Sequence, residues 1–112
     1  MRGFRNCAVL FALAALPGEV AADGYIMGAG RWTCAQVRQV AESGTPAEVG
    51  QLAGWLLGFW SAATLQRETH FVDIVEQVGG EKIVRATVQE CAKAPSTVRL
   101  HEVAGKMIEN TR

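Results

Sequence analysis

The sequence lacks the features that mark most enzymes and nucleic-acid-binding proteins. Its 112 residues hold eleven Lys and Arg against eleven Asp and Glu, so no excess of positive charge is present to attract a nucleic acid. It has only two histidines, and no GxSxG, HExxH or Walker sequence occurs. We therefore expect no catalytic residues, no metal site, no cofactor and no nucleic-acid partner, and we do not expect an enzyme.

Cysteine is also scarce. The chain has three cysteines, and no two of them form a CxxC pair. Cys7 lies in the N-terminal apolar segment, which leaves Cys34 and Cys91 in the rest of the chain. In an exported chain the default prediction is one disulfide, which would close a loop of roughly sixty residues and contribute about 4 kcal/mol. Metal ligation or a redox pair is the alternative, but the histidine neighbours or close spacing typical of such sites are missing.

The first 22 residues have the pattern of a cleavable secretory signal. Arg2 and Arg5 precede an apolar run at 7–16, and small residues follow at 20–22. Ten apolar residues are too few to span a bilayer as a helix. We predict cleavage after Ala22, although the segment could instead stay attached as a helix. Cleavage leaves one domain of about ninety residues with a net charge of about −1.

Periodicity and capping signals predict a small all-α bundle over residues 32–110, after a flexible leader at 23–31. Thr33 is expected to cap the first helix, and Thr45 with Glu48 forms a capping box at the start of the second. The four main helices are expected at 32–42, 46–69, 81–93 and from residue 96 onward. An interruption is expected at 70–72, followed by a short fifth helix that Asp73 caps and Gly79 ends. No segment has the pattern of a strand.

The stretch 50–64, GQLAGWLLGFWSAAT, has no charged residue. It could be a membrane span or the buried spine of a small domain. A span would place Cys34 and Cys91 on opposite sides of the membrane, where they could not pair. The disulfide and the span therefore exclude one another, and we favour the spine.

As a spine, this helix has a stripe of small residues at positions 50, 54, 58 and 62. Three glycines in one helix need a packing reason, and the stripe would let another helix approach closely. Trp55, Phe59 and Trp60 would form a protein-binding patch wherever the small core leaves them uncovered. The alternative is that all three rings are simply core.

Several short motifs resemble the HdeA/HdeB-type periplasmic proteins. They are Trp32-Thr33-Cys34 at the first helix, the GWLLGF run at 54–59, and Cys91 followed by Pro95 and a last helix. The resemblance covers most of residues 31–110. It implies a small helical fold with one disulfide. The best-known members are acid-stress chaperones that are dimers at neutral pH, and in acid they loosen and expose apolar surface that holds unfolding clients.

The resemblance also implies roles for particular residues. It makes Cys34–Cys91 the structural bridge, and it places the dimer or client surface on Trp55, Phe59 and the nearby leucines. The protein-binding residues that we predict are Trp55, Leu56, Phe59 and Trp60. The expected partners are unfolded clients or one specific protein, with a homodimer at neutral pH and no stable membrane span. Below about pH 3 the carboxylates lose their charge, so the mature chain would carry about +12 and repel itself.

A second resemblance implies a different partner. Immunity proteins of the Tai type, which block a neighbour's cell-wall amidase toxin, share a Gly-aromatic helix and a later Cys followed by Pro. In that case the apolar patch would dock into one enzyme's cleft. The further alternatives are a single-span membrane protein and a periplasmic domain with another role.

Overall fold

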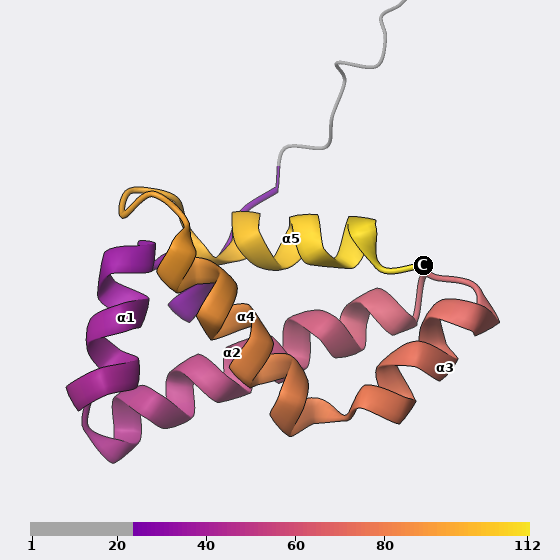
Figure 1. Cartoon of the computed structure of the whole chain (residues 1–112), viewed down its shortest axis with the longest axis horizontal. Coiled ribbons are helices and arrows are strands. Elements are labelled where there is room, and N and C mark those ends of the chain that lie inside the picture. Colours follow the sequence, from indigo (N-terminus) through magenta and orange to yellow (C-terminus); the bar gives the residue numbers. More distant parts are fainter. Residues whose placement is uncertain (1–23) are drawn as a thin grey trace, which may run out of the picture.

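The computed structural model describes residues 24–112, and these form an all-helical structure with no strand (Figure 1). The predicted signal peptide lies outside the described residues. The elements are η2 (Gly28–Arg31, a 3₁₀ helix), α1 (Cys34–Ser43), α2 (Pro46–Thr64), α3 (Thr69–Val78), α4 (Gly80–Lys93) and α5 (Leu100–Asn110). The prediction of an all-α fold stapled by one disulfide is confirmed, since Cys34 and Cys91 are bonded at an S–S distance of 2.06 Å.

The first two helices begin where their capping residues predict. Thr33 accepts a hydrogen bond from the Gln36 backbone N–H, and the Gln36 side chain accepts one from the Thr33 N–H. Thr45 and Glu48 make the same reciprocal pair at the start of α2. Each box satisfies two backbone donors that a helix start would otherwise leave unpaired.

The long second helix ends earlier than predicted, at Thr64 instead of 69. The break lies at residues 65–68, and α3 then begins at Thr69, so the predicted interruption at 70–72 is wrong. Asp73 lies inside α3 and does not cap it. The short fifth helix is also longer than expected, with ten residues, as many as α1.

Contacts with the C-terminus account for the position of this break. Arg67, in the 65–68 segment, donates a hydrogen bond to the Ile108 carbonyl at 3.0 Å, near the end of α5. The Arg67 guanidinium also lies 4.1 Å from the centre of the Phe71 ring, a cation–π contact. The bond to Ile108 ties the 65–68 segment to the end of α5, whereas the contact with Phe71 spans four residues and would also be possible within a continuous helix.

The last helix begins at Leu100, not at residue 96 as predicted. Residues 96–98 are instead held against the start of α1. The backbone N–H of Cys34 donates to the Val98 carbonyl at 2.7 Å, and that of Ala35 donates to Ser96 at 3.1 Å. Because these carbonyls face α1, they cannot serve as the first acceptors of a helix at 96.

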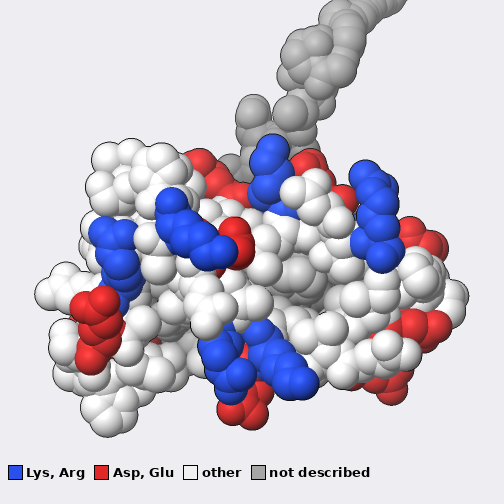
Figure 2. Space-filling view, viewed as in Figure 1, with Lys and Arg blue, Asp and Glu red and all other residues white. Residues whose placement is uncertain are grey.

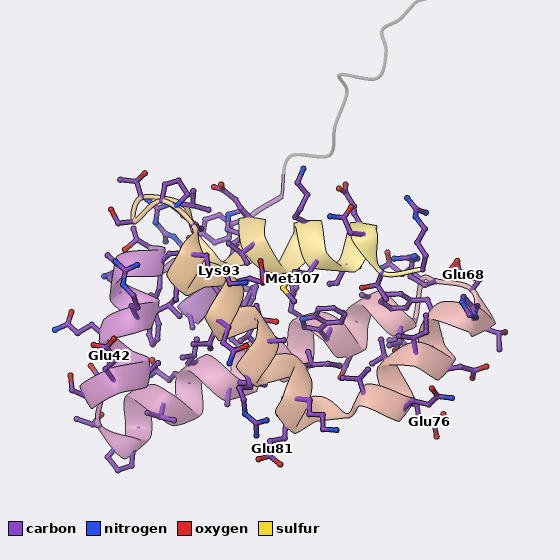
Figure 3. All side chains as sticks on the ribbon, in the orientation of Figure 1. Glu42, Glu68, Glu76, Glu81, Lys93 and Met107 are labelled. Carbon is purple, nitrogen blue, oxygen red and sulfur yellow. A yellow bond between two sulfur atoms is a disulfide. The ribbon has the colours of Figure 1, made fainter. Side chains whose placement is uncertain are left out.

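Charged side chains of both signs are scattered over the face drawn in Figure 2, with no large region of one sign. Glu42, Glu68, Glu76 and Glu81 project outward from the helices, whereas Met107 points inward from α5 (Figure 3). Every Asp and Glu among residues 24–112 is exposed. The three ion pairs between described residues are Arg67–Glu68, Arg85–Glu81 and Lys93–Glu90.

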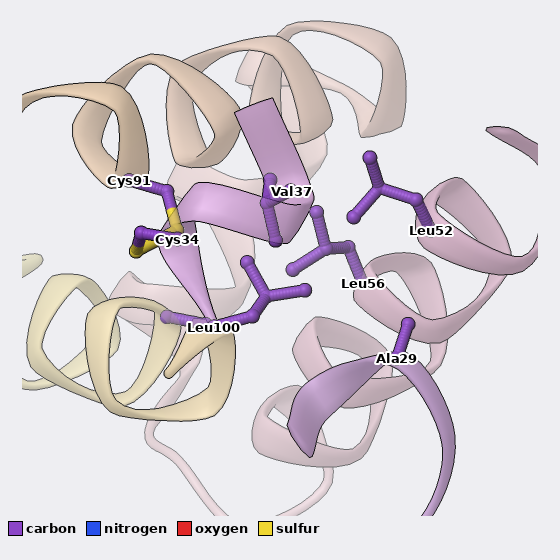
Figure 4. Close-up of a cluster of buried hydrophobic side chains, with 8 residues drawn as sticks. Ala29, Cys34, Val37, Leu52, Leu56, Cys91 and Leu100 are labelled. Carbon is purple, nitrogen blue, oxygen red and sulfur yellow. A yellow bond between two sulfur atoms is a disulfide. The ribbon is translucent and has the colours of Figure 1, made fainter. Parts of the chain in front are cut away.

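The buried side chains form two clusters. The main cluster surrounds the disulfide and joins η2, α1, α2, α4 and α5 (Figure 4). Its members are Ala29, Cys34, Val37, Leu52, Leu56, Cys91, Leu100 and Ala104. The second cluster consists of Trp60, Phe71 and Ile83, with Met107 and Ile108 among the residues packed against it. Only the main cluster contains the covalent staple.

Part of the predicted leader is packed on the bundle. Residues 28–31 form η2, which contacts α2 and α5, and Ala29 and Gly30 are buried. The flexibility predicted for the leader stays a prediction. Within residues 24–112, no helix combines the length and the apolar character that a bilayer crossing requires.

Candidate functional site

The four residues predicted to bind protein all lie on α2, but they face in two directions. Leu56 is fully buried in the main cluster, and Trp60, at 5% exposure, belongs to the second cluster. Trp55 and Phe59 are only partly buried and pack on the outside of the main cluster. In the folded chain, Trp55 and Phe59 are therefore the two that a partner can reach.

Trp55 and Phe59 form a stacked pair one helical turn apart. Their ring centroids are 4.7 Å apart and the ring planes are inclined by 17°. The indole also lies on the backbone of η2. A Cβ at Gly30 would sit 2.1 Å from Trp55 Cζ2, so only glycine leaves room for the ring. Gly28, with φ of 76°, lies beneath the other edge of the indole.

One side of α2 is turned to solvent and carries no charge. We define the α2 outer face as Gly50, Gln51, Gly54, Leu57, Gly58, Ser61, Ala62 and Leu65, all of which are exposed. The nearest charged residues in the sequence are Glu48 and Arg67, beyond its two ends. A solvent-facing side of a helix is ordinarily polar and charged. This face instead presents small residues, with Leu57 at 43% and Leu65 at 86% exposure.

The glycine stripe lies at the centre of this face, and no described atom fills the space where side chains would be. A Cβ at Gly50, Gly54 or Gly58 would meet no atom within 4 Å beyond its own helical turn. The sequence predicted that another helix would approach the stripe closely. No helix among residues 24–112 does so, and the stripe stays open.

Two shallow, uncharged hollows adjoin the stacked rings. The first, with a volume of 420 Å³, is lined by Gly28, Ala29, Gly50, Gln51, Gly54 and Trp55. The second, of 270 Å³, is lined by Phe59, Ala62, Ala63, Gln66, Gly105 and Ile108. One lies at the Trp55 end of the pair and the other at the Phe59 end. Together with the α2 outer face they make one apolar surface between η2 and α5.

This surface is suited to apolar contact with a partner, and it has no cluster of side chains that could bind a metal ion. In the part of the chain that the structure describes, no three His, Cys, Asp or Glu side chains gather closely enough to hold a metal ion. The three ion pairs lie on α4 and at the 65–68 break, and none of them involves a residue of the α2 outer face. What a partner meets on this surface is aliphatic carbon, two aromatic rings, and the amide and hydroxyl groups of Gln51, Gln66 and Ser61.

No protein-family model, curated protein or solved structure matches this chain. The resemblances to HdeA/HdeB-type and Tai-type proteins stay predictions that rest on their short motifs. The assignment of the candidate surface therefore rests on its geometry alone.

The sequence did not identify every residue of this surface. The sequence places Gly28 and Gly30 only in the leader, whereas in the structure their backbone lies against the Trp55 indole. Their spacing of two residues, just ahead of a helix cap, is the one signal of a close backbone contact. Leu57 and Leu65 were not singled out either, because periodicity alone does not show which apolar positions the bundle leaves uncovered.

Proposed function

We propose that this protein is a small exported protein-binding domain, and that it holds unfolding clients in acid in the manner of the HdeA-type chaperones. The observation that carries the proposal is the α2 outer face, which is exposed and uncharged and whose glycine stripe leaves a space that no other part of residues 24–112 fills.

The argument for a protein partner begins with the cost of the glycines. Each glycine in a helix interior destabilises it by about 1 kcal/mol relative to alanine. Nothing within residues 24–112 compensates this loss of stability, because no described neighbour occupies the space beside Gly50, Gly54 and Gly58. A partner backbone packed closely against the stripe would use that space. Exposed leucines beside the stripe and the stacked rings next to it would extend the same contact.

The argument for acid activation rests on how charge and staple are distributed. The exposed carboxylates lose their charge in acid, and the remaining Lys, Arg and His repel one another. The disulfide restrains the main cluster, whereas the second cluster has no covalent link. Acid would therefore loosen the α3 end first and expose Trp60 and Phe71, in addition to the α2 outer face. A client would then meet a larger apolar surface on a scaffold that is still stapled.

One observation favours the Tai-type immunity role as the second candidate. In the folded chain the Trp55 and Phe59 rings are already stacked, and Trp55 lies against Gly28 and Gly30 of η2. The arrangement of this pair therefore does not depend on acid. A preformed surface of this kind suits one specific partner at neutral pH.

The experiment compares two lysine variants in an aggregation assay. Ser61→Lys puts a charge on the α2 outer face, and Ser43→Lys makes the same change at the exposed end of α1. Light scattering of an unrelated unfolding protein is measured at about pH 2.5. We expect the wild-type chain and Ser43→Lys to suppress aggregation equally, and Ser61→Lys to be several-fold weaker.

Each result has a definite reading. A wild-type chain that does not suppress aggregation would overturn the holdase role, and tight one-to-one binding of an amidase at neutral pH would then support the immunity role. Equal activity of the two variants would overturn the assignment of the surface to α2.

A further inference from the structure

A hollow that the proposed function does not use lies where α1 meets the start of α2, at the end of the bundle opposite α3 (Figure 1). We call it the α1–α2 hollow, and it has a volume of 260 Å³. No residue of the α2 outer face lines it, so the two surfaces are distinct. Its lining includes Trp32, Gln36, Gln39, Val40, Ser43 and Glu48.

The apolar part of this lining is held in place by the core. Trp32 and Val40 are partly buried and pack against the main cluster. The backbone of Trp32 is also fixed, because its N–H donates to the Ala29 carbonyl and its carbonyl accepts from the Leu100 N–H, both at 2.9 Å. The indole therefore forms a stable wall against which the apolar face of a ring can lie.

The polar part of the lining is held by the two capping boxes. Gln36 Oε1 accepts from the Thr33 N–H at 2.8 Å, and Glu48 Oε1 accepts from the Thr45 N–H at 2.9 Å. Each bond fixes one oxygen, which leaves the Gln36 amide N–H groups as donors and Glu48 Oε2 as an acceptor. The exposed side chain of Gln39 adds a further amide that has no hydrogen-bond partner among residues 24–112. The helix starts thus position donors and an acceptor beside the indole.

This set of groups discriminates between classes of ligand. No Lys or Arg lines the α1–α2 hollow and Glu48 is negatively charged, so an anion is disfavoured. The amide N–H groups of Gln36 and Gln39 have the wrong polarity for a cation. A wholly apolar ligand would displace water from these polar groups without replacing its hydrogen bonds. A neutral ring with several hydroxyl groups suits the lining, because each hydroxyl can both donate and accept.

We propose that the α1–α2 hollow binds a neutral pyranose sugar, with the C–H face of the ring against Trp32 and hydroxyl groups bonded to Gln36, Gln39 and Glu48. Since a cavity of about 150 Å³ holds benzene, a volume of 260 Å³ leaves room for a six-membered ring with its substituents. The proposal does not depend on the proposed function, because it uses no residue of the α2 outer face.

Indole N–H signals in a two-dimensional ¹H–¹⁵N spectrum of the mature chain at neutral pH test the proposal. Methyl β-glucopyranoside is the probe, and Trp32→Phe identifies the Trp32 signal. Cyclohexanol is the control that keeps a six-membered ring but has one hydroxyl group. We expect a saturable shift of the Trp32 signal with the glucoside, with a dissociation constant on the order of 1 mM. Cyclohexanol should bind about tenfold more weakly, because it replaces fewer hydrogen bonds.

A charged sugar tests the role of Glu48. Methyl β-glucuronide has the same ring with a carboxylate and should bind several-fold more weakly than the glucoside. Glu48→Gln removes the charge but keeps the capping box, since glutamine serves equally well at this position. In Glu48→Gln the two sugars should bind equally. A preference for the glucoside that persists in Glu48→Gln would overturn the assignment of the site.

A matched pair of variants tests the site without changing Trp32 or a capping residue. Gln39→Leu removes an amide from the hollow, and Gln89→Leu makes the same change at an exposed position of α4. Binding of the glucoside should weaken several-fold in Gln39→Leu and stay unchanged in Gln89→Leu, whether or not Trp32→Phe folds. No saturation with the glucoside, equal affinity for the glucoside and cyclohexanol, or unchanged binding in Gln39→Leu would each overturn the proposal. None of these results bears on the aggregation assay, which reads the α2 outer face.

Discussion

Replacing the stripe glycines by alanine should stabilise the protein, although glycine-to-alanine changes in a packed helix contact are ordinarily harmful. At Gly54 a new Cβ meets no atom within 4 Å beyond its own helical turn, so nothing offsets the gain in helix propensity. That gain is about 1 kcal/mol for one residue in a helix interior. The same holds at Gly50 and Gly58, and the triple variant should gain about 3 kcal/mol if the effects add.

Gly30→Ala supplies the matched opposite case. Its Cβ would lie 2.1 Å from Trp55 Cζ2, so the indole or η2 must move. Overpacking of this kind typically costs about 1–3 kcal/mol. The same amino-acid change should therefore have opposite signs at positions 30 and 54.

Urea unfolding at neutral pH, followed by circular dichroism, measures both effects. In thermal unfolding, a gain of 1 kcal/mol should raise the melting temperature of a domain of this size by about 4–8 °C. If Gly54→Ala lowers the free energy of unfolding, some other part of the protein covers the stripe, and the reasoning about an open face is refuted. The triple variant should also hold clients less well despite its higher stability, because three methyl groups keep a partner backbone away from α2.

Three further outcomes follow from the packing. Replacing Cys34 and Cys91 together by alanine should lower the free energy of unfolding by about 4 kcal/mol, measured by urea titration; a loss below 1 kcal/mol would contradict the role of the staple. Arg67→Met should cost about 1–2 kcal/mol and speed amide exchange in α3, because the bond to Ile108 and the contact with Phe71 are lost. At about pH 2.5, amide protection should fall first in α3 and last in α1; simultaneous loss would contradict a stapled scaffold.

The sequence predicted the elements whose signals are local. The capping boxes at Thr33 and Thr45 depend on residues three positions away, so the starts of α1 and α2 could be read directly. The end of α2 could not, since it depends on a bond from Arg67 to a carbonyl 41 residues further along the chain. The start of α5 was missed for the same reason, because Ser96 and Val98 are held by backbone groups of α1.

The candidate surface was predictable only in part. The spacing of Gly50, Gly54 and Gly58 places them on one face of any helix. Which aromatic ring is covered depends on what packs against it, and the sequence does not show that. Trp60 is buried by Phe71 and Ile83 from other helices, whereas Trp55 rests on η2 and keeps an exposed side.

The most direct test of the account is to map where a client touches the chain. A photo-crosslinking amino acid is placed at position 58, on the α2 outer face, and in a second protein at position 92, on the exposed side of α4. Both proteins are mixed with an unfolding client at about pH 2.5 and irradiated. We predict a covalent adduct with the client from position 58 and little or none from position 92. Equal adducts from both positions, or none from position 58, would contradict the claim that the α2 outer face binds protein.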